Sequence, residues 1–299
     1  MLSFFRSSLS HTKIDFMKFH KLALVISVVS IIASCVFVFA KGLNFGIDFA
    51  GGVLIEARID GDFELSEVRE LISSQIKDVQ IQNVDGKDLM IRVAKTDSDQ
   101  SVIIKKVQDI LGQKFSNVEY RKVDYVGPQV GGELIQKGIL ALVLSFAFIM
   151  LYIWVRFDWQ FGAGGIFALV HDAILTVGFY ALSGLEFNLT SIAALLTVIG
   201  YSINDSVVIY DRIRDDLRRY KKMDLSKLIN LSTNSTLSRT VLTSSVTLVS
   251  LLALMIFGGE ALFSFSCATF VGIVIGTYSS IYISAPILLY FDPRKEEKK

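Results

Sequence analysis

The chain has 299 residues, of which 52% are hydrophobic and 20% are charged, with a formal net charge of +1. A mean hydropathy of +0.51 excludes an ordinary soluble enzyme, and the near-zero net charge gives no reason to expect nucleic acid as a partner. The two cysteines, Cys35 and Cys267, both lie in apolar segments, so neither a structural disulfide nor a metal site is predicted.

Six apolar segments are long enough to form membrane-crossing helices, each of which needs roughly 20 apolar residues. They cover about 22–40, 134–155, 162–183, 189–210, 240–257 and 262–289. The first is predicted to be retained rather than cleaved as a signal peptide, because residues 1–21 precede it and no small-residue cleavage pattern follows. The sequence therefore predicts an α-helical membrane protein, in which helices two to six occupy residues 134–290.

Lysine and arginine gather in three segments that lie on the same side of a six-helix chain. These are the N-terminal segment 1–21, the basic loop 211–238 between the fourth and fifth spans, and the tail 291–299. Positive residues that flank membrane spans stay on the cytoplasmic side. Both termini and the loop are thus predicted to be cytoplasmic, and residues 41–133 to be extracytoplasmic.

The segment 41–133 alternates strand and helix patterns, with period-two and period-3.6 hydrophobicity respectively. The predicted elements are a strand over 45–59 with a break at Gly51 and Gly52, a helix over 65–76, strands over 79–84 and 89–94 around the turn Asp85–Gly86, a helix over 101–115 and a strand over 118–126. The order β-α-β-β-α-β predicts a ferredoxin-like α+β domain between the first two membrane helices. That fold by itself indicates no function.

Three ionisable residues lie within or at the edge of the predicted spans. Asp172 is near the middle of the third, Asp205 lies in the cytoplasmic half of the fourth, and Arg239 stands at the cytoplasmic start of the fifth. A charge at the centre of a membrane helix costs about 2.5–3.5 kcal/mol, so such residues usually face the helix bundle and often mark the path of an ion or a proton. All three are candidate proton-pathway residues.

Polar residues accompany these charges at helical spacing. The members of this polar face are Thr197, Tyr201 and Asn204 around Asp205, and Thr243 one turn after Arg239. Hydroxyl-bearing and small residues permit hydrogen bonds and close packing between membrane helices, so the polar face is predicted to point at other helices. In the sixth span, Gly272 and Gly276 form a GxxxG pair that predicts close helix packing.

Each charged residue also has a structural interpretation. Asp205 could be a hydrogen-bond acceptor that pins two helices, and Asp172 could be the same, although its neighbour His171 offers no second clear partner. Arg239 lies where a positive residue is expected from membrane orientation alone. The basic loop could be solvated, or it could contact anionic lipid.

Enzymatic chemistry is not indicated. His171 and Asp172 resemble half of a catalytic diad, but no nucleophile accompanies them, and the sequence contains neither HExxH nor GxSxG. It contains no P-loop motif either. No catalytic residue and no bound metal are predicted.

A pairing of Asp205 with Arg239 would give a proton-dependent mechanism. An ionised carboxylate is stabilised beside an arginine, and protonation of the carboxylate removes that attraction. The two residues lie in the cytoplasmic halves of consecutive helices, so contact is geometrically plausible, although the sequence does not establish it. A proton gradient could then bias the packing of helices that have two arrangements.

Six stretches follow one another along nearly the whole chain. They read LNFGIDFAGGVLIEAR, VGPQVGGELIQKGILAL, RFDWQFGAGGIFALVHDAILTVG, IGYSINDSVVIYDRIRD, TLSRTVLTS and GIVIGTYSSIYISAPILL. In this order they resemble the SecF family, the smaller partner of SecD in the bacterial Sec protein-export pathway. The stretch GIDFAGG alone would be shared with SecD, whereas INDSVVIYDRIR followed by GTYSS is typical of SecF.

The resemblance implies a function and partners. SecD and SecF belong to the RND superfamily, whose transport unit has twice as many spans, so a SecD-like partner is expected to supply the others. The complex is held to use the proton gradient across the inner membrane to complete export of unfolded polypeptide after SecA and SecYEG have begun it. Protons are the expected coupling ion, no cofactor is expected, and residues 41–133 would form the periplasmic domain.

The resemblance also assigns residues. The family's proton-pathway aspartate and arginine match Asp205 in INDS and Arg239 in LSRT, and Asp172 matches the HD of the third span. In GIDFAGG, the glycines are predicted to permit a tight bend, and Asp48 is predicted to be structural. Two other classes stay open: a non-conducting scaffold of a translocon, and an RND-type exporter of small molecules or lipids, which the small extracytoplasmic domain disfavours.

Overall fold

The structure is a computed structural model that describes residues 13–60, 63–76, 79–83, 87–93, 100–115 and 117–295. The chain divides into two units. One, the membrane unit, comprises Met1–Asn44, Ala141–Glu186 and Thr190–Lys299, and the other, the sheet unit, comprises Phe45–Leu140 and Phe187–Leu189. Within the described residues, six helices are long and apolar enough to cross a membrane, as predicted.

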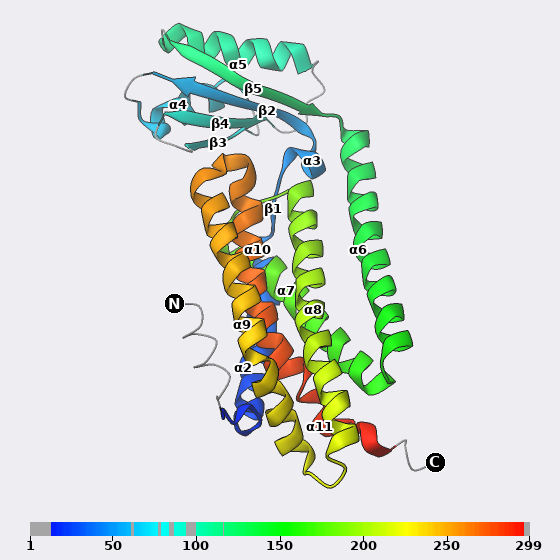
Figure 1. The fold of residues 1–299 in the computed structure, drawn as a ribbon. Coiled ribbons are helices and arrows are strands. Elements are labelled where there is room, and N and C mark those ends of the chain that lie inside the picture. Colours follow the sequence, from blue (N-terminus) through cyan, green and yellow to red (C-terminus); the bar gives the residue numbers. More distant parts are fainter. Residues whose placement is uncertain are drawn as a thin grey trace. The chain divides into compact units, whose positions relative to one another are not determined.

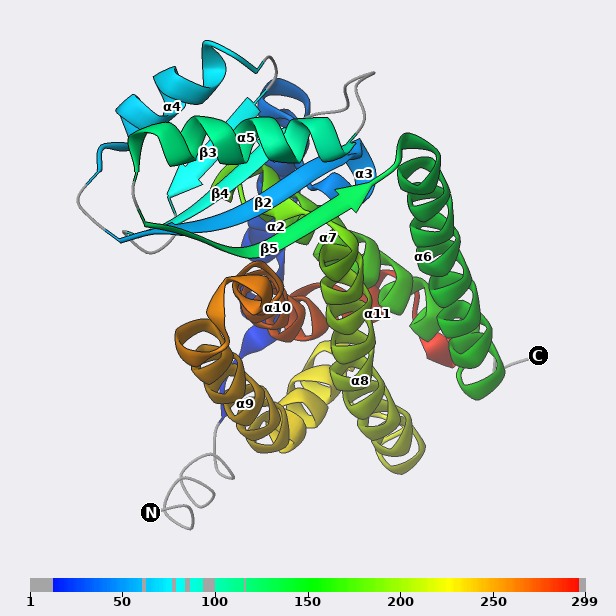
Figure 2. The same cartoon turned by 90° about the horizontal axis from the view of Figure 1, so that it is seen from above.

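The sheet unit is built around an antiparallel four-stranded sheet. Its elements follow in the order β2 (Gly52–Ile59), α4 (Leu65–Ser73), β3 (Val79–Asn83), β4 (Asp88–Val93), α5 (Gln100–Lys114) and β5 (Val118–Val126). The strands lie in the order β3-β4-β2-β5, with Ile55 of β2 opposite both Ile91 of β4 and Val123 of β5. Both helices lie over the same face of the sheet (Figure 1 and Figure 2), so the predicted ferredoxin-like fold is confirmed. The predicted turn at Asp85–Gly86 lies outside the described residues.

One apolar core holds this sheet and its helices together. Val68 and Ile72 of α4, and Val107 and Leu111 of α5, recur at the four-residue spacing that places them on one helix face, and all four are fully buried. They form a single cluster with alternate strand residues such as Ile55. The hydrophobic periodicity of the sequence therefore determines which face of each helix meets the sheet.

The prediction of one strand over 45–59 is wrong. The chain instead forms β1 (Asn44–Phe45), a short helix α3 (Ile47–Ala50) and then β2, and β1 pairs with β6 (Glu186–Phe187) in a separate two-stranded sheet. Gly51 and Gly52 have φ values of 71° and 121°, which residues with a side chain rarely adopt. These two glycines turn the chain from α3 into β2, as the predicted bend requires.

Asp48, in α3, caps the start of a membrane-crossing helix. Its Oδ2 accepts a hydrogen bond of 3.1 Å from the backbone N–H of Leu189, the first residue of α8 (Leu189–Arg219). The first N–H groups of a helix have no partner within the helix, and a carboxylate there also suits the helix dipole. Gly131, in α6 (Pro128–Arg156), lies against the same short helix, because a Cβ on it would be 3.1 Å from the carbonyl oxygen of Phe49.

We expect Asp48→Ala to loosen the first turn of α8, because a lost N-terminal cap costs about 1 kcal/mol. Amide hydrogen exchange over residues 189–191 should then become about fivefold faster. Asp48→Asn is the matched control, since its side-chain carbonyl still accepts the bond. Unchanged exchange in D48A would show that this hydrogen bond does not hold the turn.

The membrane unit is organised around α7 (Trp159–Ser183). Its other helices are α2 (His20–Lys41), α6 from Ala141 onward, α8, α9 (Leu225–Phe257) and α10 (Gly259–Ser279), with the short turns η1 (Phe16–Lys18) and η3 (Pro293–Lys295). Helix α7 packs against both α2 and α10, and α9 and α10 form an antiparallel hairpin (Figure 1). The apolar stretches of α7 and α8 are half buried, whereas those of α2 and α9 are mostly exposed.

The predicted loop over 211–238 is wrong, because most of it is helical. Only residues 220–224 connect α8 to α9. The side chain of Asp224 caps α9 by accepting hydrogen bonds from two backbone N–H groups of its first turn. Apolar residues of both extensions, such as Ile213 and Leu228, are fully buried in one cluster. Most of the positive charges therefore lie on two helices, and only Lys221 and Lys222 lie on the turn that connects them.

The sixth predicted span, 262–289, is not one continuous α-helix. It consists of the end of α10, a π-helical turn η2 (Ser280–Ser284) and α11 (Ile287–Tyr290). Pro286 explains the interruption, because proline has no backbone N–H and its ring clashes with the carbonyl four residues earlier in an α-helix. The chain widens by one residue instead, and the N–H of Ala285 bonds at 3.3 Å to the carbonyl of Ser280, five residues earlier.

Candidate functional site in the membrane helices

Asp172 is the buried centre of a polar cluster formed by three helices. Its side chain, on α7, is 0% exposed, and its Oδ2 accepts hydrogen bonds from Ser202 Oγ of α8 at 2.5 Å and from Ser279 Oγ of α10 at 2.7 Å. Its Oδ1 lies 2.8 Å from Nδ1 of His171. A buried carboxylate needs such donors, because an unpaired one in an apolar interior is strongly destabilising. The Asp172 cluster therefore ties α7, α8 and α10 together.

From the sequence alone, Asp172 has no clear partner, and the structure corrects this. Its two hydroxyl donors lie 30 and 107 residues further along the chain. A signal was present, because Ser202 lies three residues before Asp205 and Ser279 belongs to the stretch GTYSS. Hydroxyl residues in otherwise apolar spans are natural donors to a buried acid on a neighbouring helix.

Asp205 is buried on α8, three residues after Ser202 of the Asp172 cluster, and one of its carboxylate oxygens accepts no hydrogen bond from the described residues. Its side chain is 2% exposed, and its Oδ2 has no hydrogen-bond partner among the described residues. Within the same residues, the buried hydroxyl oxygens of Ser206 on α8 and of Thr240 on α9 also lack partners. Buried polar groups are normally paired, so each unpaired one calls for an explanation, such as a functional role or a bound water. Asp205 Oδ2 is thus available to a proton or a water molecule inside the protein, whereas both carboxylate oxygens of Asp172 already have hydrogen-bond partners.

Arg239 does not pair with Asp205. In the part of the chain that the structure describes, no ion pair or hydrogen bond joins the two side chains, and Asp205 Oδ2 has no partner at all. Arg239 is exposed, and its carbonyl oxygen accepts a hydrogen bond of 3.0 Å from Thr243 Oγ1. The charge pair that the sequence allows is therefore not formed within this chain.

The predicted polar face of α8 and α9 points away from the rest of the membrane unit. Its exposed members are Thr197, Asn204 and Thr243. Tyr201 is half-buried, and its hydroxyl accepts a hydrogen bond of 3.5 Å from Thr247 Oγ1 of α9. Tyr201 therefore contacts α9 of the same chain, whereas Thr197, Asn204 and Thr243 are exposed at the surface of the membrane unit. For these three residues, the expectation that the polar face points at other helices stays a prediction.

Gly272 and Gly276 allow α10 to approach α8 closely. A Cβ on Gly272 would lie 2.2 Å from Val198 Cγ2, and one on Gly276 would lie 3.1 Å from Ser202 Cβ. The first distance is far below van der Waals contact, so a side chain at Gly272 would force the helices apart. The two glycines therefore lie at the interface of α8 and α10, next to the Asp172 cluster.

A second polar layer lies further along the same helices. Ser284 Oγ, at the end of η2, donates a hydrogen bond of 2.5 Å to the hydroxyl oxygen of Tyr210 on α8. Gly164 of α7 leaves room for this contact, because a Cβ there would lie 2.6 Å from both the Ser284 carbonyl oxygen and the Tyr210 hydroxyl. Gly164 precedes Asp172 by eight residues, and Tyr210 follows Ser202 by eight, so the two layers are about two helical turns apart. Sequence reasoning identified none of these partners.

A hollow of about 720 Å³ at the turn between α8 and α9 is strongly basic. It is lined by Arg218, Arg219, Tyr220, Lys221, Lys222, Met223, Asp224 and Lys227. Among the described residues, none of these basic side chains forms an ion pair, whereas the nearby Arg212 pairs with the buried Asp216 at 3.1 Å. Asp224 is already occupied in capping α9. The chemistry of this basic hollow suits an anionic headgroup.

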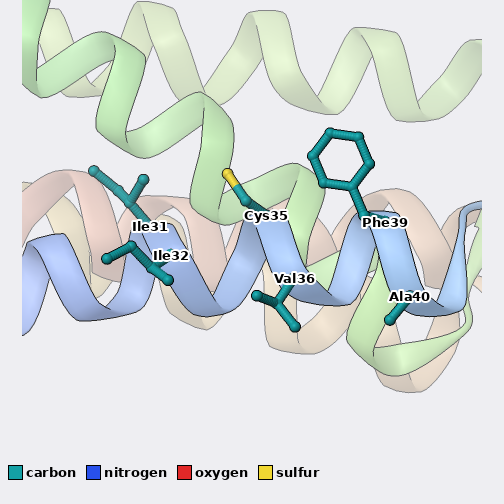
Figure 3. Close-up of a pocket in the computed structure, with 6 residues that line it drawn as sticks. All are labelled: Ile31, Ile32, Cys35, Val36, Phe39 and Ala40. Atoms are coloured by element: carbon teal, nitrogen blue, oxygen red, sulfur yellow. The ribbon is translucent and has the colours of Figure 1, made fainter.

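A second hollow, of about 460 Å³, lies on α2 and is apolar. Figure 3 shows the side chains that line it, which are Ile31, Ile32, Cys35, Val36, Phe39 and Ala40. Apart from the Cys35 thiol these are hydrocarbon groups, so the surface suits lipid chains or an apolar helix rather than a polar substrate. Among the residues that the structure describes, no group of three or more His, Cys, Asp or Glu side chains could hold a metal ion.

Two protein families match the chain. Residues 36–62 match the family described as "SecD/SecF GG Motif", and residues 106–294 match "Protein export membrane protein SecD/SecF, C-terminal". The first match includes Asp48, and the second includes Asp172, Asp205 and Arg239.

The chain is also similar to proteins named protein translocase subunit SecF. It is 51% identical to that of Rickettsia bellii (strain OSU 85-389) over 288 residues, which cover 95% of each chain. It is 50% identical to that of Rickettsia rickettsii (strain Sheila Smith) over 291 residues, which cover 95% of this chain and 94% of the relative.

Two solved structures share the fold. SecDF from Thermus thermophilus, described as a translocon-associated membrane protein, matches with a TM-score of 0.86 and 34% identity over 95% of this chain. SecDF in a super-membrane-facing form matches with a TM-score of 0.67, also at 34% identity over 95% of this chain. The chain spans 39% of the length of each SecDF chain, but nearly the full length of the SecF relatives. It therefore belongs to the SecF family of SecD/SecF protein-export membrane proteins, and it is a multi-pass membrane subunit of a protein translocase.

Proposed function

We propose that this translocase subunit, together with a SecD-like partner, couples proton movement across the bacterial inner membrane to late-stage export of unfolded polypeptide. The observation that carries the proposal is Asp205, a buried carboxylate on a membrane-crossing helix whose Oδ2 has no hydrogen-bond partner in the part of the chain that the structure describes. A purely structural aspartate is expected to have a partner on each carboxylate oxygen, as Asp172 has. A free acceptor at membrane depth suits reversible proton binding.

The outward polar face supports the assignment of a membrane partner. Arg239 is exposed together with Asn204 and Thr243 on helices that cross the membrane. A guanidinium group that faces lipid hydrocarbon on a membrane-crossing helix is unfavourable, so this face needs a polar cover. A SecD-like partner supplies that cover in our proposal, and it encloses Arg239 and Asp205 in one protein interior. Exported polypeptide would reach this complex from the SecA and SecYEG pathway.

Cross-linking tests the partner surface. In a chain whose two native cysteines are replaced by serine, Asn204→Cys should cross-link to the SecD-like partner in membranes. Val249→Cys is the control, because Val249 is 66% exposed and apolar, as expected of a lipid-facing residue on α9. Equal cross-linking at the two positions would show that the polar face is not the interface.

We further infer that the basic hollow faces the cytoplasm and binds anionic lipid headgroups. The concentration of arginine and lysine at the turn between α8 and α9 supports this orientation. A membrane-impermeant thiol reagent should label Lys222→Cys from the cytoplasmic side only. Lys105→Cys, on α5, should be labelled from the periplasmic side only. The opposite pattern would reverse the orientation.

The mechanism follows from the charge of Asp205. The ionised carboxylate attracts the Arg239 guanidinium, and the protonated one does not. Loss of that attraction lets α8 and α9 adopt a second packing arrangement. Movement of one charge through 100 mV supplies about 2.3 kcal/mol, which is enough to shift such an equilibrium about fiftyfold.

Export by membrane vesicles tests the proposed function. Vesicles that hold the chain, the SecD-like partner and the SecYEG–SecA machinery should lose a late component of export when an ionophore collapses the proton gradient at constant ATP. Vesicles without the chain should lack that component from the outset. A stimulation by the chain that survives collapse of the gradient would identify a structural scaffold instead.

A further inference from the structure

We propose that the π turn η2 is the joint at which the last membrane span changes its packing during transport, and that Asp172 and Tyr210 are the residues that position this joint. The inference rests on the proposed proton coupling at Asp205. The turn covers Ser280–Ser284 and separates α10 from α11. Single π turns inside α-helices occur frequently at functional sites, where they contain one residue more than the regular helix needs.

Both ends of the joint are tied to the central helices by buried hydrogen bonds. At its start, Ser279 Oγ donates to Asp172 Oδ2 of α7 at 2.7 Å. At its end, Ser284 Oγ donates to the Tyr210 hydroxyl of α8 at 2.5 Å. All four side chains are fully buried, so water does not compete for these bonds. The packing of the joint therefore depends on where α7 and α8 hold these two acceptors.

The two ties bracket Asp205 on α8. Ser202 shares Asp172 Oδ2 with Ser279 and lies three residues before Asp205. Tyr210 lies five residues after Asp205 and receives the bond from Ser284. A shift or rotation of this part of α8 would change the bond between Ser284 and Tyr210 directly. It would also change the surroundings of Asp172 Oδ2, because Ser202 donates to the same oxygen as Ser279. Whatever moves α8 at Asp205 thus acts directly on η2.

The end of the joint lies directly against α7, and the α-helical pattern is interrupted just after it. Pro286 keeps the helix open at this point, because it cannot donate the missing backbone bond. Gly164 of α7 has no side chain, and a Cβ there would lie 2.6 Å from the carbonyl oxygen of Ser284. Glycine at this position therefore allows the backbone of η2 to approach α7 closely.

The segment before the joint is fastened to two other helices. Thr277 Oγ1 lies 2.8 Å from Ser244 Oγ of α9. The hydroxyl of Tyr278 donates to the carbonyl oxygen of Ala23 in α2 at 2.8 Å. The segment before the joint is thus held by α2 and α9, whereas the joint itself is held by α7 and α8. A change in the packing of α7 against α8 would therefore bend the span at η2.

A reversible cross-link tests the joint. The rings of Trp159, at the start of α7, and Phe291, after α11, have centroids 5.5 Å apart, and both residues are exposed. In a chain whose native cysteines are replaced by serine, Trp159→Cys and Phe291→Cys can be linked by a short bifunctional thiol reagent that a reductant cleaves. We expect the link to abolish gradient-driven export in the assembled complex, and the reductant to restore it, while ATP-driven export continues.

A second link provides the matched control. Ser244→Cys with Thr277→Cys fastens α9 to α10 ahead of the joint, where the hydroxyl oxygens already lie 2.8 Å apart, and it should leave gradient-driven export intact. Full activity of the linked W159C/F291C complex would overturn the proposal. Equal loss with both links would also overturn it, because the effect would not be specific to the joint. If the unlinked complex shows no gradient-driven export, the proposed function fails instead.

Tyr210→Phe tests the positioning role. Phenylalanine keeps the edge-on packing of this ring against Phe161, at 5.2 Å between centroids, but leaves Ser284 without its acceptor. Loss of one buried hydrogen bond should slow gradient-driven export about fivefold at an equal amount of assembled complex, with ATP-driven export unchanged. Tyr282→Phe is the control, because that hydroxyl, within η2, forms no hydrogen bond to any described residue. An unchanged gradient-driven rate in Y210F would overturn the assignment of Tyr210.

Discussion

Asp205→Asn is expected to abolish the gradient-driven component of export while the complex stays assembled. Asparagine has nearly the same shape as aspartate, but its amide neither takes up a proton nor carries charge at physiological pH. Because Asp205 Oδ2 has no partner in the described part of the chain, the substitution breaks no hydrogen bond seen there, and stability should change by less than about 1 kcal/mol. Export by energised vesicles, with and without an ionophore, measures the effect, and copurification with the SecD-like partner measures assembly.

Asp215→Asn is the matched control, since Asp215 lies on the same helix but is exposed. It should leave both components of export unchanged. Asp205→Glu keeps an ionisable group on a longer side chain and should retain part of the gradient-driven activity. Full gradient-driven export in D205N would contradict a proton-binding role for Asp205, and so would a loss of export that only follows from failed assembly.

Gly272→Ala is expected to destabilise the membrane unit by about 1–3 kcal/mol, which is typical of overpacking. The new methyl would lie 2.2 Å from Val198 Cγ2, so α8 and α10 would have to separate. That separation would also stretch the Asp172 cluster, because its donors Ser202 and Ser279 lie on the same two helices. The thermal unfolding midpoint of the purified complex in detergent should fall by several degrees.

A second substitution distinguishes this clash from a general effect of alanine. Val198→Ala removes the methyl groups that the new side chain would meet, so G272A/V198A should regain most of the lost stability. Gly200→Ala is the control, since a Cβ at Gly200 has no neighbour within 4 Å. A G272A chain as stable as the unsubstituted one would contradict the close approach of the two helices.

The strands and helices of the sheet unit and the membrane spans could be predicted from the sequence wherever the spacing of hydrophobic residues determines the local structure. The helices α4 and α5 bury most of the residues that their periodicity indicates, except that Val102, predicted to be buried in α5, is 57% exposed. The four-residue helix α3 could not be predicted, because Ile47 and Phe49 are apolar residues that suit a strand equally well. The prediction of a loop over 211–238 is wrong because the many charged residues in this segment suggest a solvated loop. Apolar residues among them, such as Ile213 and Leu228, pack in a common core instead.

The candidate site was predictable only in part. A carboxylate in an apolar run is visible in any sequence, which is why Asp172 and Asp205 could be identified. The cost of a charge in lipid predicts the burial of Asp205, but the direction in which a side chain points depends on tertiary packing, so the exposure of Arg239 and Asn204 could not be predicted. Partners such as Tyr210 and Ser284, which are 74 residues apart, form a pair only in the folded chain.

The Asp172 cluster also constrains how the chain is made. Its two hydroxyl donors are synthesised 30 and 107 residues after Asp172 itself. An aspartate at the centre of a membrane helix opposes insertion by about 2.5–3.5 kcal/mol. The transfer of α7 alone from the insertion machinery into lipid is therefore unfavourable. We therefore expect α7 to stay beside the insertion machinery until α8 and then α10 emerge. The membrane helices of this subunit would then assemble in one late step, once α10 has been synthesised and Ser279 can donate its hydrogen bond to Asp172.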